Sequence, residues 1–477
     1  MIEGGGSICD GSVVAPPTDP WVGSKAVSGA STSGAGQTVE LLQHLIRNQC
    51  VNDGSEASGQ EARSAELIEG FLEGSGLSLE RYESAPGRGS LVARLEGSDP
   101  GAPSVLLLGH TDVVPVTPAK WRRDPFGGEL IDGVVWGRGA VDMLNLTASM
   151  AVATKRLASE GFAPRGTLVY LAVADEEALG SYGTDWLLQH HPDAVRADYV
   201  ITEAGGYRFP LPSRSGPKVP MLVGEKGSFW CTVRVFGTAG HASTPLRTDN
   251  ALVRAAEVVR RLAEYRPETM IPETWRKFVE ALDPPDDLRA ELLDLGGIES
   301  FCEREEDLSL AREVHACTHT TIAPTVMHAG VKTNVIPDAV DLELDIRTLP
   351  GQTGDDIRAM LREALGAELY EAIEIVATAN EEATESPVDT PLWDSMGRVT
   401  EGLAPGVTPV PIITTGATDA RFFRRRGIAS YGAGLFSNRI SFAEFGAMFH
   451  GDNERIDVES LHLSTEFWHR LAHDFLN

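Results

Sequence analysis

The chain has 477 residues, 42% of them hydrophobic, which is too long for one ordinary hydrophobic core and predicts at least two domains. Its formal net charge of −28 comes from 69 acidic residues against 41 lysines and arginines, and this field disfavours nucleic acid and anionic membranes as partners. Five dispersed cysteines without CxxC spacing argue against a disulfide framework and a thiolate zinc site. Neither a membrane-length apolar run nor a secretory signal is visible, so we expect a cytoplasmic protein.

Residues 1–38 are rich in Gly, Ser, Ala and Pro and predict a disordered or loosely ordered arm. From residue 39 to about 220, amphipathic helices alternate with almost continuously apolar strands such as SVLLLGH and GTLVYLAVADEE. Strands of this kind are typical of a parallel sheet that helices cover on both faces. We therefore predict an α/β fold with a mostly parallel central sheet, which resumes at residues 381–477.

The pattern changes near residue 220. GSFWCTVRVFG and AVDLELDIRTL alternate between apolar and polar residues, and two helical segments, NALVRAAEVVRRLAEY and GDDIRAMLREALG, are interleaved with them. This order predicts a small α+β (ferredoxin-like) domain at residues 221–380, inserted into the larger fold. Within it, residues 266–315 form a polar, acidic and helical excursion to which the sequence assigns no role.

Polar side chains follow the apolar strands of the larger fold. His110 and Asp112 end one strand, the run ADEE ends the next, and ITEAGG ends a third. In open α/β sheets, sites form beyond the carboxyl ends of strands, so these side chains are expected on one rim. Each also has an ordinary explanation: Asp112 and Asp142 fit helix caps, and His110 fits a loop histidine.

The combination favours a metal site. Adjacent carboxylates such as Asp175, Glu176 and Glu177 repel one another unless a cation or a shared proton relieves them. Imidazole with carboxylate, without thiolate, suits Zn²⁺ or Co²⁺ in a hydrolytic site. A second imidazole is needed, and His450 in FHGDNERI offers one, although spacing alone does not single it out among twelve histidines.

Eight segments resemble the M20 metallopeptidases, in the family's order: GHTDVVP, GRGAVDM, ADEEALGSYG, ITEAGG, GTAGHAS, TNVIPDA, GATDARF and HGDNERI. The family includes glutamate carboxypeptidases, aminoacylases, succinyl-diaminopimelate desuccinylases and acetylornithine deacetylases. The resemblance runs from about residue 39 to the end. It implies a zinc-peptidase-like catalytic domain at 39–220 and 381–477, with 221–380 as an inserted lid and dimerisation domain.

Carried over residue by residue, the resemblance implies two Zn²⁺ per subunit, with Co²⁺ or Mn²⁺ as possible substitutes. Asp142 would bridge the two ions. His110 and Glu203 would complete one metal, and Glu177 and His450 the other. Glutamate at position 203 is more typical of the family's carboxypeptidases and aminoacylases than of its aminopeptidases.

The resemblance also implies roles around the metals. Glu176 would be the general base, and Asp112 would orient His110. The remaining family positions are substrate-side: His241 resembles the histidine that reaches a neighbouring subunit's active site, and Asn334 and Arg421 resemble groups that bind the substrate carboxylate. Arg347 is an alternative for that carboxylate, although a structural role on its strand is favoured.

We therefore expect a two-zinc hydrolase that cleaves a peptide amide bond next to a free carboxylate, as a dipeptidase or carboxypeptidase does. The alternative within hydrolases is deacylation of an N-acyl amino acid, which needs the same metals and differs in the acyl-side pocket. An alternative of another class is a non-catalytic binding protein that keeps the fold, but no ligand or base is missing from this sequence. The resemblance also implies a homodimer that forms through the inserted domain.

Overall fold

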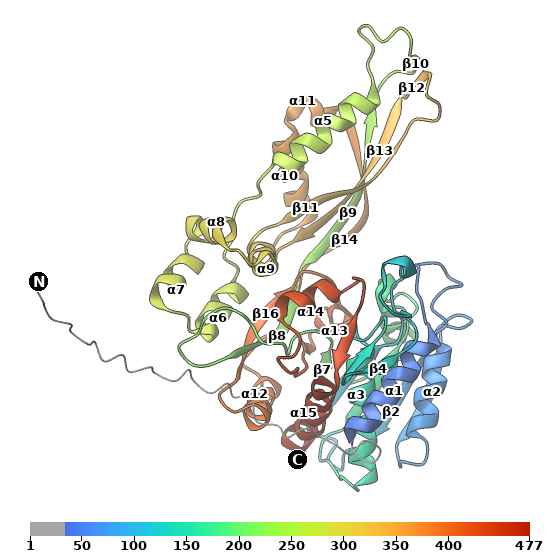
Figure 1. Ribbon diagram of the computed structural model, residues 1–477, viewed down its shortest axis with the longest axis vertical. Coiled ribbons are helices and arrows are strands. Elements are labelled where there is room, and N and C mark those ends of the chain that lie inside the picture. Colours follow the sequence, from blue (N-terminus) through green and yellow to red (C-terminus); the bar gives the residue numbers. More distant parts are fainter. Residues whose placement is uncertain (1–33) are drawn as a thin grey trace, which may run out of the picture.

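The computed structural model describes residues 34–477, which form a lower part around a nine-stranded sheet and an elongated upper part around a four-stranded sheet (Figure 1). The predicted arm lies outside the described residues up to position 33. Helix α1 (Gly34–Asn48) begins within the rest of it, so the arm prediction is wrong for residues 34–38. Thr38 is buried there, with its Oγ1 2.8 Å from Oγ1 of Thr465, because this turn already packs on the core.

The large sheet is mixed. Its order is β1-β2-β6-β3-β7-β17-β8-β15, and β16 also pairs with β8. The strands are β1 (Ser78–Glu83), β2 (Gly89–Leu95), β3 (Val105–His110), β6 (Leu168–Val173), β7 (Tyr199–Thr202), β8 (Lys218–Glu225), β15 (Thr384–Glu385), β16 (Thr408–Thr414) and β17 (Ala429–Gly432). Parallel pairing joins the neighbouring strands β6, β3, β7 and β17 in the middle of the sheet. Antiparallel pairing attaches β1 and β2 at one edge and β15 at the other. The α/β prediction is confirmed, with the parallel pairing concentrated in the middle of the sheet.

Helices cover both faces of this sheet, as the continuously apolar strands predict. Alternate residues of β3 face opposite cores: Leu107 packs with α1, α3 and α15, and Leu106 and Leu108 pack with α4 and α13. The helices of this part are α2 (Ala62–Leu72), α3 (Leu144–Ser159), α4 (Thr184–His190), α12 (Pro391–Leu403), α13 (Ala420–Arg424), α14 (Phe442–Met448) and α15 (Val458–Leu476), with the 3₁₀ turns η1 (Pro118–Lys120) and η2 (Glu176–Ala178). A small sheet joins β4 (Glu129–Ile131), β5 (Val134–Trp136) and β18 (Arg455–Asp457). Among the described residues, no helix has the length and apolar character needed to cross a bilayer.

The upper part has the predicted ferredoxin-like order of two helices and four antiparallel strands, arranged β11-β13-β9-β14. Its strands are β9 (Gly227–Phe236), β11 (Thr321–Ala329), β13 (Ala339–Thr348) and β14 (Ile373–Glu381), and the two helices of this order are α5 (Ala251–Glu264) and α10 (Gly354–Leu365). The short α11 (Ala367–Glu371) is added before β14. A two-residue pairing of β10 (Gly240–His241) with β12 (Val335–Ile336) lies at its far tip (Figure 1). Strand β8 belongs to the large sheet as far as Glu225, so the small sheet starts later than residue 221. The domain boundaries themselves stay a prediction.

The predicted excursion is a group of four helices, α6 (Glu273–Leu282), α7 (Asp286–Leu292), α8 (Leu295–Arg304) and α9 (Leu308–Thr318), here called the helical insert. Although it lies in the chain between α5 and β11, it packs on strand β16 of the large sheet. Trp275 and Phe278 of α6 share a buried cluster with Val410 and Ile412 of β16. The insert therefore links the upper part to the edge of the lower one (Figure 1).

Candidate metal centre

Three neighbouring strands of the large sheet end at one rim and place the predicted ligands there. His110 is the last residue of β3, Glu176 and Glu177 follow β6 in the turn η2, and Glu203 directly follows β7. His110 is fully buried, and Glu203 is almost so. Asp142 precedes α3, on the far side of a glycine-containing loop, and reaches the same point. The rim is the place where parallel strands bring side chains together.

Asp142 lies between two imidazoles. Its Oδ1 is 3.1 Å from Nε2 of His110, and its Oδ2 is 3.3 Å from Nε2 of His450. Oε2 of Glu203 lies 3.7 Å from the same His110 nitrogen, and Oε2 of Glu177 lies 3.1 Å from that of His450. The ligand atoms form two groups, each with all atoms within 4.8 Å of one another, and both groups contain Asp142. One carboxylate is thus shared by two candidate cation sites.

Asp112 contacts both His110 and the turn that carries Glu176 and Glu177. Its backbone carbonyl lies 3.0 Å from Nδ1 of His110, while its carboxylate is farther from that ring, at 3.6 Å. The carboxylate instead accepts hydrogen bonds from the backbone N–H groups of Glu176 at 3.2 Å and Glu177 at 3.1 Å. When Nδ1 donates to the carbonyl, Nε2 keeps its lone pair for a cation. Asp112 therefore contacts His110 mainly through its carbonyl and holds the Glu176–Glu177 turn through its side chain.

The loop that carries Asp142 is shaped by Glu454, a residue that sequence reasoning did not single out. Its buried carboxylate accepts hydrogen bonds from the backbone N–H groups of Gly139, Val141 and Asp142 at 2.9, 2.6 and 2.8 Å. It also forms an ion pair with Arg138 at 2.8 Å. The sequence offered one signal for Glu454: it lies in the HGDNERI segment, which also contains the predicted ligand His450.

Asp175, the first acid of ADEE, is turned away from the candidate cation sites. It accepts hydrogen bonds from the side chain of Asn52 at 3.1 Å and the backbone N–H of Tyr182 at 2.8 Å. It also lies 3.3 Å from Arg88, which forms a fully buried ion pair with Glu61 at 2.6 Å. Its own backbone is left-handed, with φ of 69°. Asp175 thus anchors the turn that presents the next two glutamates.

The electrostatics of the centre show crowding of buried acids. Burial raises the pKa of Glu203 to about 8 and that of Glu177 to about 7. The pKa of Glu176 is also raised well above its usual value, by burial first and by the neighbouring Glu203 second. Burial acts in the same direction on Asp142, but hydrogen bonds with the two histidines hold its pKa well below the usual range. Divalent cations relieve such crowding.

The donor set fits a pair of divalent cations. Imidazole and carboxylate are the ligands of hydrolytic metal sites, and no cysteine contributes to either group. In addition, Oε1 of Glu177 is buried and has no hydrogen-bond partner among the described residues, which is unusual for a carboxylate oxygen unless something else binds it.

The centre opens into a cavity of about 790 Å³. The sheet rim, the small sheet and the helical insert all contribute to its wall. The metal side contains Asp142, Glu176, Glu177, Glu203 and His450, and the rest of the wall includes Tyr207, Trp230, Arg312, Glu313, Arg347, Arg421, Phe442, Phe445 and Phe449. Arg312 and Glu313 come from α9, so the helical insert, whose role the sequence left open, is one wall of the site.

Two arginines proposed for the substrate carboxylate are already engaged. Arg421 lines the cavity, but its side chain is only 3% exposed, and it donates to the carbonyl oxygens of Thr418 at 2.6 Å and Leu179 at 3.0 Å. Arg347 forms a two-point ion pair with Asp345, at 2.7 and 3.0 Å. The second arrangement agrees with the structural role favoured for Arg347.

His241 and Asn334 lie together, but not at the centre. They belong to the exposed β10–β12 tip of the upper part, where the backbone N–H of Ala242 donates to the carbonyl of Asn334 at 3.1 Å (Figure 1). The ring of His241 contacts Ser243, with Nδ1 2.7 Å from the hydroxyl oxygen. Within the described chain, neither residue lines the cavity.

Two imidazole–carboxylate groups that share an aspartate, at the carboxyl end of an α/β sheet, make this rim a candidate metal centre of a hydrolase. The chain belongs to peptidase family M20/M25/M40, whose sequence pattern matches residues 106–474. It is accordingly an amidohydrolase of the M20 type, and the resemblance seen in its eight motifs is confirmed.

Relatives in this family differ in their named substrates. The chain is 28% identical over 444 residues to the N-fatty-acyl-amino acid synthase/hydrolase of Xenopus tropicalis, covering 91% of this chain and 85% of that protein. It is 26% identical over 443 residues to the succinyl-diaminopimelate desuccinylase of Maricaulis maris, covering 90% and 94%. Both likenesses extend over nearly the whole chain.

Solved structures share the fold. The M20 family metallo-carboxypeptidase Sso-CP2 from Sulfolobus solfataricus superposes with a TM-score of 0.68 at 18% identity, covering 92% of this chain and 99% of that one. A dinuclear metal binding peptidase of the family from Bacillus subtilis superposes with a TM-score of 0.56 at 13% identity, covering 92% and 98%. At these identities the likeness shows the architecture of both parts of the molecule.

Proposed function

We propose that this chain is a two-metal hydrolase that cleaves an amide bond next to a free carboxylate in a small peptide, as a dipeptidase or carboxypeptidase does. The observation that carries the proposal is the position of Asp142, with one carboxylate oxygen toward His110 and the other toward His450. The cavity beside it has room for a small peptide, and the carboxypeptidase of similar fold supports this substrate class.

The ligands would divide into two sets. His110, Asp142 and Glu203 would hold one cation, and Asp142, Glu177 and His450 the other. Zn²⁺ suits this mixture of imidazole and carboxylate, with Co²⁺ or Mn²⁺ as substitutes. When bound, such a pair of cations polarises a carbonyl group and lowers the pKa of a water molecule toward about 7.

Glu176 would act as the general base. Its carboxylate lines the cavity, belongs to neither ligand set, and lies 3.9 Å from Nε2 of His110. The hydrogen bond from its backbone N–H to Asp112 fixes its turn. A carboxylate in this position can take the proton of the attacking water and return it to the leaving nitrogen, so that it ends the cycle unchanged.

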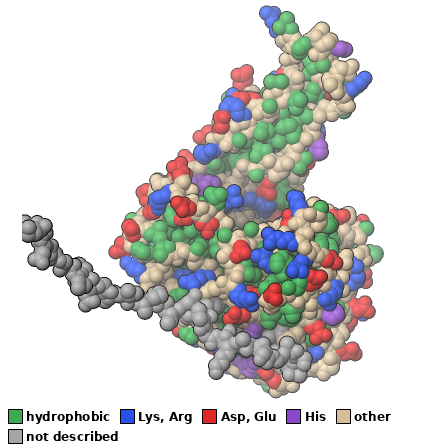
Figure 2. All heavy atoms as spheres, viewed as in Figure 1, with side chains coloured by type: hydrophobic (Ala, Val, Ile, Leu, Met, Phe, Trp, Pro, Cys, Tyr) green, Lys and Arg blue, Asp and Glu red, His purple; other side chains and the backbone are tan. Residues whose placement is uncertain are grey.

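A second copy of the chain would complete the site. His241 and Asn334 lie at the exposed tip, so in a homodimer they would reach the cavity of the partner subunit. The upper part has the surface for such pairing, because β11 is an edge strand with Val326 and Met327 39% and 40% exposed. Figure 2 shows further hydrophobic side chains gathered along the upper part.

The second candidate is deacylation of an N-acyl amino acid. Aromatic side chains form much of the cavity wall, namely Tyr207, Trp230, Phe442, Phe445 and Phe449. Such a wall suits an apolar acyl group better than the charged amino end of a peptide. The names of the hydrolase and desuccinylase relatives support the same reading.

A substrate panel tests the proposal and separates the two candidates. The enzyme, stripped of metal and reloaded with Zn²⁺ or Co²⁺, is assayed with dipeptides, succinylated amino acids and long-chain N-acyl amino acids of matched carboxyl residues. A kcat/KM at least about tenfold higher for dipeptides supports peptidase activity. The reverse order supports deacylation. Metal binding without turnover of any of these amides would overturn both and favour the non-catalytic protein.

A further inference from the structure

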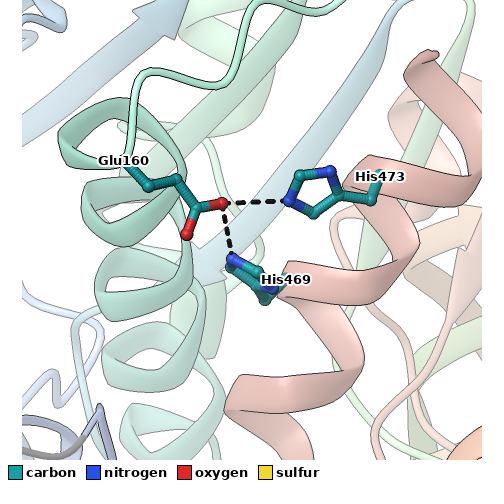
Figure 3. A group of neighbouring side chains, drawn as sticks. All are labelled: Glu160, His469 and His473. Carbon is teal, nitrogen blue, oxygen red and sulfur yellow. Dashed lines mark hydrogen bonds and ion pairs between the residues drawn. The ribbon is translucent and has the colours of Figure 1, made fainter.

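We infer that Glu160, His469 and His473 form a second, peripheral site for a divalent transition-metal ion such as Zn²⁺ (Figure 3). Nε2 of His469 lies 2.8 Å from Oε1 of Glu160, and Nε2 of His473 lies 2.9 Å from the same oxygen. The three ligand atoms are all within 4.8 Å of one another, which is also the spacing within the two groups of the metal centre.

The two histidines have the spacing of a chelating pair. They lie four residues apart on α15, so both rings project from one face of the helix, as the histidines of helical zinc sites do. Two imidazoles, one carboxylate and a water molecule make a complete tetrahedral Zn²⁺ shell. The ring of His473 is held by Phe162, with their centroids 4.3 Å apart. The donor atoms are thus gathered before any ion arrives.

The helix ends favour positive charge at this place. Glu160 is the C-terminal cap of α3, and His473 lies in the last turn of α15. Unpaired carbonyl groups give each helix a partial negative charge at its C-terminal end, where cations are stabilised. The positive charge of Arg156, which acts on His469, is paired with Glu466 at 2.5 Å. The two helix ends and the carboxylate of Glu160 therefore favour a cation here, against the opposing charge of Arg156.

The site is accessible from solvent. The side chains of Glu160 and His473 are each 40% exposed, so an ion and its water can enter. Burial and the nearby Arg156 lower the pKa of His469, which favours its neutral ring. Each Nε2 atom donates its proton to Glu160, so an ion binds there when that proton moves to Nδ1 or to water. Hydrogen bonds from the two histidines hold the pKa of Glu160 below its usual value despite partial burial, which keeps it ionised.

The site would act as a clamp, away from the chemistry. Helix α3 begins two residues after Asp142, and its 16 residues span about 24 Å before reaching Glu160. Helix α15 follows β18, which comes directly after Glu454. An ion at the far ends of these two helices would join the two elements that carry and shape the Asp142 loop.

The test measures metal content. The full chain is loaded with Zn²⁺, dialysed exhaustively and analysed for bound zinc per chain in the wild type, in a His469→Ala/His473→Ala variant and in His462→Ala. His462 is on the same helix but outside the group, and serves as the matched control. The double variant is expected to hold one equivalent less than the wild type, and His462→Ala the same amount as the wild type.

A background variant separates this site from the metal centre. Asp142→Asn chains are expected to lose the zinc of the metal centre but to keep one equivalent of zinc at the peripheral site. Adding His473→Ala to these chains should remove that equivalent. If the double histidine variant does not fold, Glu160→Gln replaces it, because the amide keeps a hydrogen-bond acceptor while losing the charge. Equal zinc content with and without these substitutions would overturn the site, whatever the central cations do.

Thermal unfolding supplies a second measurement. An ion that binds only the folded chain raises the melting temperature, by an amount that grows with the logarithm of its concentration relative to Kd. In the Asp142→Asn background, added Zn²⁺ should raise the melting temperature, and His473→Ala should abolish that rise. A rise that persists in the His473→Ala chain would mean that the ion binds elsewhere.

Discussion

The metal side and the substrate side of the cavity are built in different ways. On the metal side, His110, Glu177 and Glu203 come from the ends of neighbouring strands in one sheet. The carboxylate of Asp112 accepts hydrogen bonds from the backbone of the glutamate turn and holds it. The substrate side draws on separate elements, with Trp230 from the small sheet, Arg312 from the helical insert and aromatic residues around α14. A change in one of these elements need not disturb the sheet. The comparison indicates that the reaction and the choice of substrate are controlled by separable parts.

Replacing Glu176, the proposed base, should produce the largest effect on turnover without changing metal binding. Glu176→Gln removes the proton acceptor but leaves both ligand groups intact, so kcat should fall by about 10²- to 10⁴-fold while bound metal per chain stays unchanged. Steady-state kinetics and metal analysis measure the two quantities. Glu368→Gln, at an exposed position on α11, is the control. Near-normal turnover in the Glu176 variant would exclude it as the base.

The tip of the upper part should act on the partner's cavity. If the imidazole of His241 stabilises the developing oxyanion, His241→Ala should lower kcat by about 10²- to 10³-fold. Mixing that chain with Glu176→Gln chains should restore activity to about a quarter of the wild type, because half of randomly formed dimers are hybrids with one complete site. Sedimentation measures the dimer in parallel. Absence of any restoration in proven hybrid dimers would place His241 outside the reaction.

Disturbing the Asp142 loop should weaken metal binding while leaving the cavity wall intact. Glu454→Gln turns one acceptor oxygen into a donor that faces backbone N–H groups, and leaves the buried Arg138 without its counter-charge. Breaking such a buried pair costs about 3–5 kcal/mol in the free energy of unfolding. Loss of a residue that positions a metal ligand without binding the metal also lowers metal affinity by about 10- to 100-fold.

Urea unfolding and chelator competition measure the two effects of Glu454→Gln. Asp452→Asn, at an exposed position in the same segment, is the matched control and should change neither quantity. Wild-type zinc affinity in a folded Glu454→Gln chain would show that Asp142 is positioned without this carboxylate.

The metal side was predictable from the sequence because its signals are local. An apolar strand followed by His110, or by ADEE, marks the carboxyl end of a parallel strand, and parallel strands end at one rim. The eight ordered motifs then indicated a partner imidazole at His450, which spacing alone did not single out. The α/β character and the interleaved small fold followed from the period of the apolar residues.

Other features depend on contacts that no local pattern records. The mixed character of the large sheet arises from strand pairing at its edges, as between β1 and β2, and the excursion became a cavity wall because α6 packs on β16. The helix start at Gly34 was missed because glycine and serine dominate that stretch, although Thr38 packs against α15. The Glu160 group joins residues about 310 positions apart, so only the packing of α3 on α15 brings it together.

A substitution in the helical insert should have the smallest effect of the four. It also tests most directly whether the metal side and the substrate side are separable. Arg312 is exposed on α9 and lines the cavity, so its charge can attract a substrate carboxylate without touching the ligands. Arg312→Ala should raise KM about fivefold with kcat unchanged, the size expected for an ion pair that remains in water. Arg276→Ala, exposed on α6 away from the cavity lining, should change neither parameter. If Arg312→Ala instead lowers kcat or metal content, the insert acts on the metal side, and reaction and substrate choice are not separable in this enzyme.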